Sequence, residues 1–195
     1  MTSAEIEWLK SLPKDILVVV DEAYFEFSKL SLVAEIGQHP NWIILRTFSK
    51  AFRLAAHRVG YAVADPEVIQ ALEKVRLPYN LPAFSQNAAL LALENRQVLL
   101  PLVAETICQR NLMWQELSSE FASDLQLWRS QANFLYIRLA KAKDQDLALA
   151  SLVTKLKNCG TLIRHTGGGI RITVGTEAEN QRTLNNLQAC LLTIS

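Results

Sequence analysis

The sequence contains only three cysteines, Cys108, Cys159 and Cys190, which lie far apart among its 195 residues. No two of them form a C-x-x-C pair and the total is odd, so their pattern indicates neither a disulfide framework nor a zinc site. We therefore expect a protein of a reducing compartment, the cytoplasm, without a structural metal.

The sequence also has almost no net charge, because 20 basic residues balance 19 acidic ones to +1. No strong field is therefore available to attract nucleic acid or an anionic membrane. The first residues lack the basic flank and apolar run of a secretory signal, and the longest apolar stretch, Ala88 to Val103, is interrupted by charged residues and a proline. We expect a soluble protein that binds small molecules.

Half of the residues are hydrophobic, which is enough for a sizeable core. Three apolar runs, Ile16 to Val20, Trp42 to Leu45 and Val59 to Ala64, have the pattern of strands buried on both faces. Helix signals lie outside them: Thr2 and Glu5 have capping-box spacing, and Asp65 is a predicted N-cap. This order predicts an α/β fold with a parallel sheet.

A different pattern follows the proline-rich linker at 77–82. Apolar spacing predicts one long amphipathic helix from Gln97 to Phe121. Beyond it we expect a strand at 133–139, a helix from 144, strands at 161–164 and 170–174, and a last helix capped by Thr176 and Glu179. We predict two domains, residues 1–100 and a small α+β domain at 101–195.

Polar side chains stand at the predicted strand ends, at 21–24, at 46–50 and at Arg58. Ligands of open α/β sheets bind at the carboxyl edge of the strands. A carboxylate, a phenol, two hydroxyls, a lysine and arginines at this edge suit a phosphate-bearing aromatic cation, and pyridoxal phosphate is such a ligand.

Two strings carry a more specific signal, V-V-V-D-E-A-Y-F-E-F at 18–27 and T-F-S-K-A-F-R-L-A-A-H-R-V-G-Y at 47–61. They resemble the cofactor-lysine region of the class I/II aminotransferases, which are fold-type I enzymes dependent on pyridoxal 5'-phosphate. The branch acting on histidinol phosphate fits best, with support from S-Q-A-N-F at 130–134 and G-I-R-I-T-V-G-T at 169–176. The resemblance implies part of the large cofactor domain followed by the small C-terminal domain.

By this resemblance Lys50 is the catalytic lysine, which binds the cofactor covalently and moves a proton. Asp21 would pair with the pyridine nitrogen, and Tyr24 would hydrogen-bond the cofactor O3′. Other interpretations remain open, because acids after strands often cap helices and Tyr24 stands beside two phenylalanines that could share a core with it.

The resemblance also assigns anion-binding residues. Thr47, Ser49 and Arg58 match the phosphate-binding residues of the family. Arg171 matches the arginine that binds the substrate carboxylate, and Arg164 matches a second substrate arginine, although it could equally be an edge-strand residue facing water.

The implied reaction moves an amino group between histidinol phosphate and 2-oxoglutarate, giving imidazole-acetol phosphate and glutamate in histidine biosynthesis. A homodimer is implied for the full-length protein. Relatives begin well upstream, so we expect an exposed apolar sheet face and an unpaired edge here.

Alternative functions are those of an aromatic aminotransferase, a decarboxylase of a phosphorylated amino acid, and an inactive fragment. A P-loop nucleotide hydrolase fragment fits worst, since no G-x-x-x-x-G-K-[ST] is present.

Overall fold

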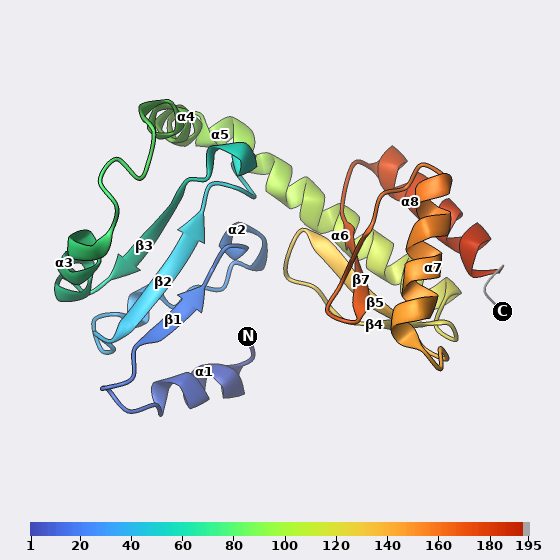
Figure 1. Cartoon of the computed structure of the whole chain (residues 1–195), viewed down its shortest axis with the longest axis horizontal. Helices are drawn as coiled ribbons and strands as arrows, with labels where there is room; N and C mark the ends of the chain where they lie inside the picture. Colours follow the sequence, from blue (N-terminus) through green and yellow to red (C-terminus); the bar gives the residue numbers. More distant parts are fainter. Residues whose placement is uncertain (193–195) are drawn as a thin grey trace. The chain divides into compact units, whose positions relative to one another are not determined.

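The computed structural model describes residues 1–192. The chain forms two compact units, Met1–Leu100 and a second unit that begins at Pro101 (Figure 1). Each unit has its own sheet.

The first unit begins with α1 (Ser3–Lys10), which starts where the capping box predicts. Thr2 Oγ1 accepts a hydrogen bond from the Glu5 amide at 3.3 Å, and Glu5 Oε2 accepts one from the Thr2 amide at 2.6 Å. These two bonds satisfy amides that the first helical turn would leave unpaired.

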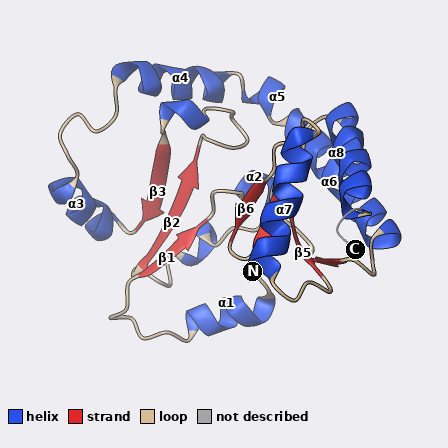
Figure 2. Cartoon of the chain, turned by 45° about the vertical axis from the view of Figure 1, so that its right-hand side comes forward, coloured by secondary structure: helices blue, strands red, loops and turns tan. Residues whose placement is uncertain are grey.

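The sheet of the first unit has the order β1-β2-β3. Its strands are β1 (Val18–Asp21), β2 (Trp42–Thr47) and β3 (Gly60–Ala64). β1 and β2 are parallel, as predicted, but β3 runs antiparallel to β2, so the expectation of a fully parallel sheet is wrong for this strand (Figure 2). A parallel return needs a crossover that is usually an α-helix, whereas the connection at 48–59 contains only the three-residue 3-10 helix Ala55–His57.

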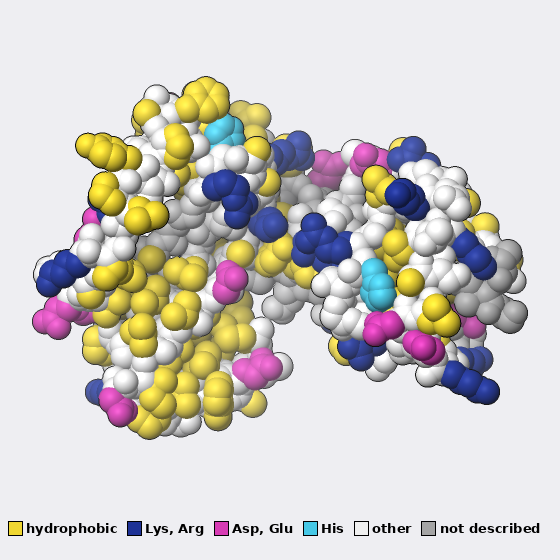
Figure 3. Space-filling model, in the orientation of Figure 1, with side chains coloured by type: hydrophobic (Ala, Val, Ile, Leu, Met, Phe, Trp, Pro, Cys, Tyr) yellow, Lys and Arg dark blue, Asp and Glu magenta, His cyan; other side chains and the backbone are white. Residues whose placement is uncertain are grey.

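The strands of this sheet are also less buried than the apolar runs predict. Val18 and Val20 are buried and pack with Trp42 and Ile44 into a core beneath α1. On the opposite face, the side chain of Val19 is 55% exposed. Figure 3 shows apolar side chains gathered over this unit, and the expectation of an exposed apolar face is confirmed.

Short helices surround the sheet. They are α2 (Phe25–Ser28), a 3-10 helix (Val33–Glu35), α3 (Pro66–Val75), α4 (Ala83–Glu94) and α5 (Arg96–Leu99). α3 begins as predicted, with the Asp65 carboxylate accepting from the Glu67 amide at 2.9 Å. The predicted single helix from Gln97 to Phe121 is wrong, because it is divided into α5 and α6 (Pro101–Glu120). Pro101 has no amide hydrogen to continue the first helix, but its fixed φ suits the start of the second.

The second unit has an antiparallel sheet with the order β4-β5-β7-β6. Its elements after α6 are β4 (Leu125–Leu127), β5 (Phe134–Leu139), α7 (Gln145–Asn158), β6 (Arg164–Thr166), β7 (Gly169–Thr173) and α8 (Glu177–Leu191). Alternate strand residues such as Leu135 and Ile172 join side chains of α6, α7 and α8 in one core.

Two details of this unit differ from the sequence prediction. β4 is not predicted at all, and the strand expected at 161–164 begins only at Arg164. Thr161 instead lies just beyond α7, where its amide donates to the Leu156 carbonyl at 2.8 Å and its hydroxyl accepts from Asn186 of α8 at 2.8 Å. These local bonds compete with strand pairing.

The predicted capping box of α8 is confirmed and has a pH-dependent consequence. Backbone and side-chain hydrogen bonds from Thr176 lower the pKa of Glu179. A carboxyl group with a lowered pKa contributes stability above its unfolded pKa, and that contribution is lost as pH falls through its folded pKa. We expect Glu179→Gln to destabilise α8 near pH 7 and to have little effect in acid, which amide hydrogen exchange at both pH values can measure. An equal effect at both values would contradict this role for the charge.

Candidate functional site

The end of β1 turns sharply into α2. Asp21 is the last residue of the strand and is exposed, and its Oδ1 accepts a hydrogen bond from the Ala23 amide at 2.9 Å. Tyr24 follows as the N-cap residue of α2. The turn therefore leaves the Asp21 carboxylate at the carboxyl edge of the sheet, three residues before Tyr24.

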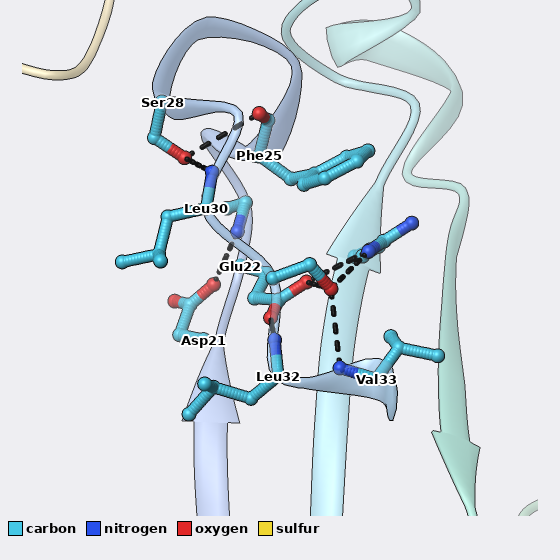
Figure 4. A network of polar contacts seen from close by, with 10 residues as sticks. Asp21, Glu22, Phe25, Ser28, Leu30, Leu32 and Val33 are labelled. Carbon is cyan, nitrogen blue, oxygen red and sulfur yellow. Dashed lines mark hydrogen bonds and ion pairs between the residues drawn. The ribbon is translucent and has the colours of Figure 1, made fainter. Parts of the chain in front are cut away.

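A buried ion pair fixes this turn against β2 (Figure 4). The Glu22 side chain, 4% exposed, accepts bonds from Arg46 Nε at 3.0 Å, Arg46 Nη2 at 2.9 Å, the Ser31 hydroxyl at 3.0 Å and the Leu32 amide at 2.6 Å. The Arg46 guanidinium also lies 3.7 Å from the centroid of the Phe25 ring. Glu22 and Arg46 thus position the ends of both parallel strands, a role that the sequence analysis missed.

The end of β2 carries three of the predicted residues. Thr47 Oγ1 lies 2.9 Å from Ser49 Oγ and accepts from the Ser49 amide at 3.0 Å, so the two hydroxyls are adjacent. The Lys50 ammonium lies 5.5 Å from the centroid of the Tyr24 ring, so the structure brings together the lysine and the phenol from two strand ends.

Arg58 reaches the same edge because of the unexpected strand direction. β3 begins at Gly60, opposite Thr47, so the residues just before it lie beside the end of β2. Had β3 been parallel, Arg58 would lie at the opposite edge. Arg58 has a left-handed backbone with φ of 56°, and its guanidinium donates to the Ala55 carbonyl at 3.1 Å. Such backbone strain in a non-glycine residue is frequent at binding sites.

Gly60 allows β3 to approach β2 closely. A Cβ at this position would lie 2.9 Å from the Arg46 carbonyl oxygen, which belongs to the backbone and cannot rotate away. We expect Gly60→Ala to destabilise the first unit by about 1–3 kcal/mol, because the strands must separate. Urea unfolding can measure this loss. Gly37→Ala is the matched control, since a Cβ at Gly37 meets no atom within 4 Å; an equal loss in both variants would contradict the explanation.

The remaining two predicted residues lie in the second unit as cross-strand neighbours. Arg164 on β6 is opposite Arg171 on β7, and Arg171 is opposite Tyr136 on β5. Residues directly opposite in antiparallel strands share a face, so both arginines project from the face opposite the core. The Arg171 guanidinium lies 3.8 Å from the centroid of the Phe134 ring, while Arg164 is exposed on the edge strand.

Comparison with known proteins shows the family. The model of aminotransferase class I and II matches residues 1–187 of this chain. The chain belongs to the class I and II aminotransferase family. Among its relatives, the histidinol-phosphate aminotransferase of Trichodesmium erythraeum (strain IMS101) is 56% identical over 195 residues, which cover 96% of this chain and 51% of the relative. The corresponding protein of Synechococcus elongatus is 53% identical, over 98% of this chain and 50% of the relative.

Solved aminotransferases have the same fold. Histidinol-phosphate aminotransferase from Sinorhizobium meliloti, solved in complex with pyridoxal-5'-phosphate, superposes with a TM-score of 0.85 and 27% identity, over 98% of this chain and 53% of that one. The predicted fold class, a partial fold-type I transferase, is therefore confirmed. This aminotransferase chain spans about half the length of the curated relatives it matches. None of the helices in the described residues has the length and apolar character needed to cross a membrane.

Proposed function

We propose that this chain is part of an aminotransferase dependent on pyridoxal 5'-phosphate that exchanges an amino group between L-histidinol phosphate and 2-oxoglutarate. The products are imidazole-acetol phosphate and glutamate, and the pathway is histidine biosynthesis. The observation that carries the proposal is the position of Lys50 beside Tyr24 at the edge where Thr47, Ser49 and Arg58 also lie. Relatives named histidinol-phosphate aminotransferase, 53–56% identical over nearly the whole chain, support the choice of substrate.

The donors and acceptors at this edge fit pyridoxal phosphate group by group. An exposed carboxylate, Asp21, suits a protonated pyridine nitrogen. The adjacent hydroxyls of Thr47 and Ser49, with the exposed Arg58 guanidinium, suit a phosphate dianion. A primary amine, Lys50, suits the aldehyde. When bound, pyridoxal phosphate supplies this aldehyde for covalent bonding to amines and a cationic ring that withdraws electrons from the substrate.

Each residue then has a defined task. Asp21 would pair with the protonated ring nitrogen, and Arg58 with the two hydroxyls would hold the phosphate. The Tyr24 hydroxyl would donate to the ring oxygen. The Lys50 amine would accept the proton from the substrate Cα and return one during the opposite half-reaction. Glu22 and Arg46 act only by positioning these strand ends.

The paired arginines of the second unit suit the substrates. Histidinol phosphate carries a phosphate, whereas glutamate and 2-oxoglutarate carry two carboxylates. Arg164 and Arg171 project from the same sheet face, and a guanidinium can bind either anion through two parallel hydrogen bonds. We propose that this pair accepts both substrates in alternate half-reactions.

The cofactor assignment can be tested on this chain and on a form extended at its N-terminus by the first half of the Trichodesmium erythraeum relative. Each protein is mixed with pyridoxal phosphate, treated with borohydride and mapped by mass spectrometry. We expect covalent labelling at Lys50 and none in Lys50→Ala. Lys29→Ala is the matched control, because Lys29 is an exposed lysine at the end of α2 and should leave the labelling unchanged. Labelling that persists in Lys50→Ala would overturn the assignment.

The substrate assignment needs the extended protein. We expect amino transfer from histidinol phosphate to 2-oxoglutarate, and loss of this reaction in Arg171→Ala. Transfer from aromatic amino acids without any from histidinol phosphate would reject this branch of the family. We also propose a cytoplasmic homodimer for the full-length protein, as in the family, and light scattering of the extended protein would test the dimer.

A further inference from the structure

Two cysteines that are distant in sequence lie at the ends of two helices that pack together in the second unit. Cys159 is the C-cap residue of α7 and is exposed, whereas Cys190 lies in the last turn of α8 and is 4% exposed. The two helices pack together in one core, which contains Leu152 and Leu156 of α7 with Leu187 and Cys190 of α8. The large sequence separation therefore hides a spatial pair.

A side-chain clamp fixes the two helix ends. Asn186 of α8 donates to the Cys159 carbonyl at 3.1 Å and to the Thr161 hydroxyl at 2.8 Å. Asn186 and Cys190 are four residues apart on α8, so their side chains lie on the same helix face. Cys190 thus lies one helical turn from Asn186, the residue whose side chain is hydrogen-bonded to the Cys159 carbonyl.

The ionisation of Cys190 is consistent with direct contact between the thiols. Burial is the largest cause that raises the pKa of Cys190, followed by a hydrogen bond with the Cys159 side chain and by the negative charge of the Cys159 thiolate. Lys155, one turn before Cys159 on α7, lowers the pKa of Cys190. Cys108, in contrast, lies on α6 and is exposed.

We propose that Cys159 and Cys190 form a reversible disulfide that locks the end of α7 to the end of α8. The oxidant is a small-molecule disulfide. The Cys159 thiolate attacks it, forms a mixed disulfide and releases one small thiol, which takes up a proton. The Cys190 thiolate then attacks Cys159 Sγ, forms the protein disulfide and releases the second small thiol with the second proton. Two protein thiols are oxidised and one small disulfide is reduced to two thiols.

The bond would close a loop of about 30 residues that contains the β6–β7 hairpin and hence Arg164 and Arg171. Closing a loop of this length restricts the unfolded chain and raises the thermal midpoint of the second unit, by on the order of 10 °C. This proposal does not depend on the proposed enzymatic function, because it concerns stability and thiol chemistry only.

The test uses the 195-residue chain, reduced and then equilibrated with oxidised glutathione. We expect the loss of two of the three thiols, a Cys159–Cys190 peptide in the mass map, a higher thermal midpoint, and reversal by dithiothreitol. Cys108→Ser is the matched control and should form the same bond. Cys159→Ser, which changes only an exposed side chain, should lose both the bond and the thermal shift.

Three outcomes would overturn the proposal. They are a bridge that includes Cys108, a stable glutathione adduct at Cys159 with Cys190 still reduced, and an unchanged thermal shift in Cys159→Ser. Cys190→Ser is unsuitable as the sole variant because Cys190 is part of the core.

Discussion

Replacing Glu22 by alanine is expected to lower the free energy of unfolding of the first unit by about 3–5 kcal/mol, because it leaves the Arg46 guanidinium without its buried partner. The Glu22 and Arg46 side chains are 4% and 15% exposed, so water cannot readily replace the missing carboxylate. Glu22 also accepts from the Leu32 amide and the Ser31 hydroxyl, which would lose their acceptor.

Amide hydrogen exchange can measure this effect because it reports on the two units separately. We expect loss of protection in peptides from β1 and β2, with peptides from β5 and β7 as an internal control. The double variant Glu22→Leu, Arg46→Met should be more stable than Glu22→Ala, since it removes both charges and retains apolar volume. If the double variant were the less stable of the two, the explanation from an uncompensated charge would be wrong.

Leu152→Ala is expected to destabilise the second unit by about 2–5 kcal/mol. Leu152 is 0% exposed and lies in the middle of α7, within the core formed with the sheet and α8. Truncation removes apolar contacts and leaves a cavity that neighbouring elements can only partly fill.

A residue of the same type on the same helix serves as the control. Leu147 is 70% exposed, so Leu147→Ala should change the free energy of unfolding by less than about 0.5 kcal/mol. Urea unfolding gives the free energy of unfolding of both variants, and amide hydrogen exchange of peptides from α7 shows whether the loss lies in this helix. Similar losses in the two variants would contradict the explanation from burial, because alanine is at least as good a helix former as leucine.

Helix starts could be predicted from the sequence because their signals are local. The capping boxes at Thr2 and Thr176 and the N-cap Asp65 are confirmed with their expected hydrogen bonds, and the helix predicted from 144 has Asp144 as its N-cap. In each case the donor and the acceptor lie within three residues of one another, so a short string contains the whole interaction.

Strand direction and burial depend on distant parts of the chain and were predicted less well. An apolar run such as Ile16 to Val20 does not show which neighbour will cover each face, and Leu17 and Val19 are in fact exposed. The connection at 48–59 contains a 3-10 helix but no α-helix, and the absence of a helical pattern in this segment could have indicated the antiparallel direction of β3.

The residues of the candidate site could be predicted from their type and from their position at strand ends. The structure shows which of them are neighbours. Lys50 with Tyr24, Thr47 with Ser49, and Arg164 with Arg171 are neighbours. Their roles remain predictions. The pairing of Glu22 with Arg46 was missed, although an acid just after one parallel strand and a base near the end of its neighbour are a recognisable signal.

The exposed face of the first sheet also affects how this chain must be handled. Leu17, Val19 and Leu45 project from that face and are 57%, 55% and 39% exposed, and β1 is an unpaired edge strand within the described residues. Open edges and apolar faces promote aggregation between molecules. Because intermolecular association increases with concentration whereas internal packing does not, dilution and the omission of kosmotropic salts should reduce association between molecules.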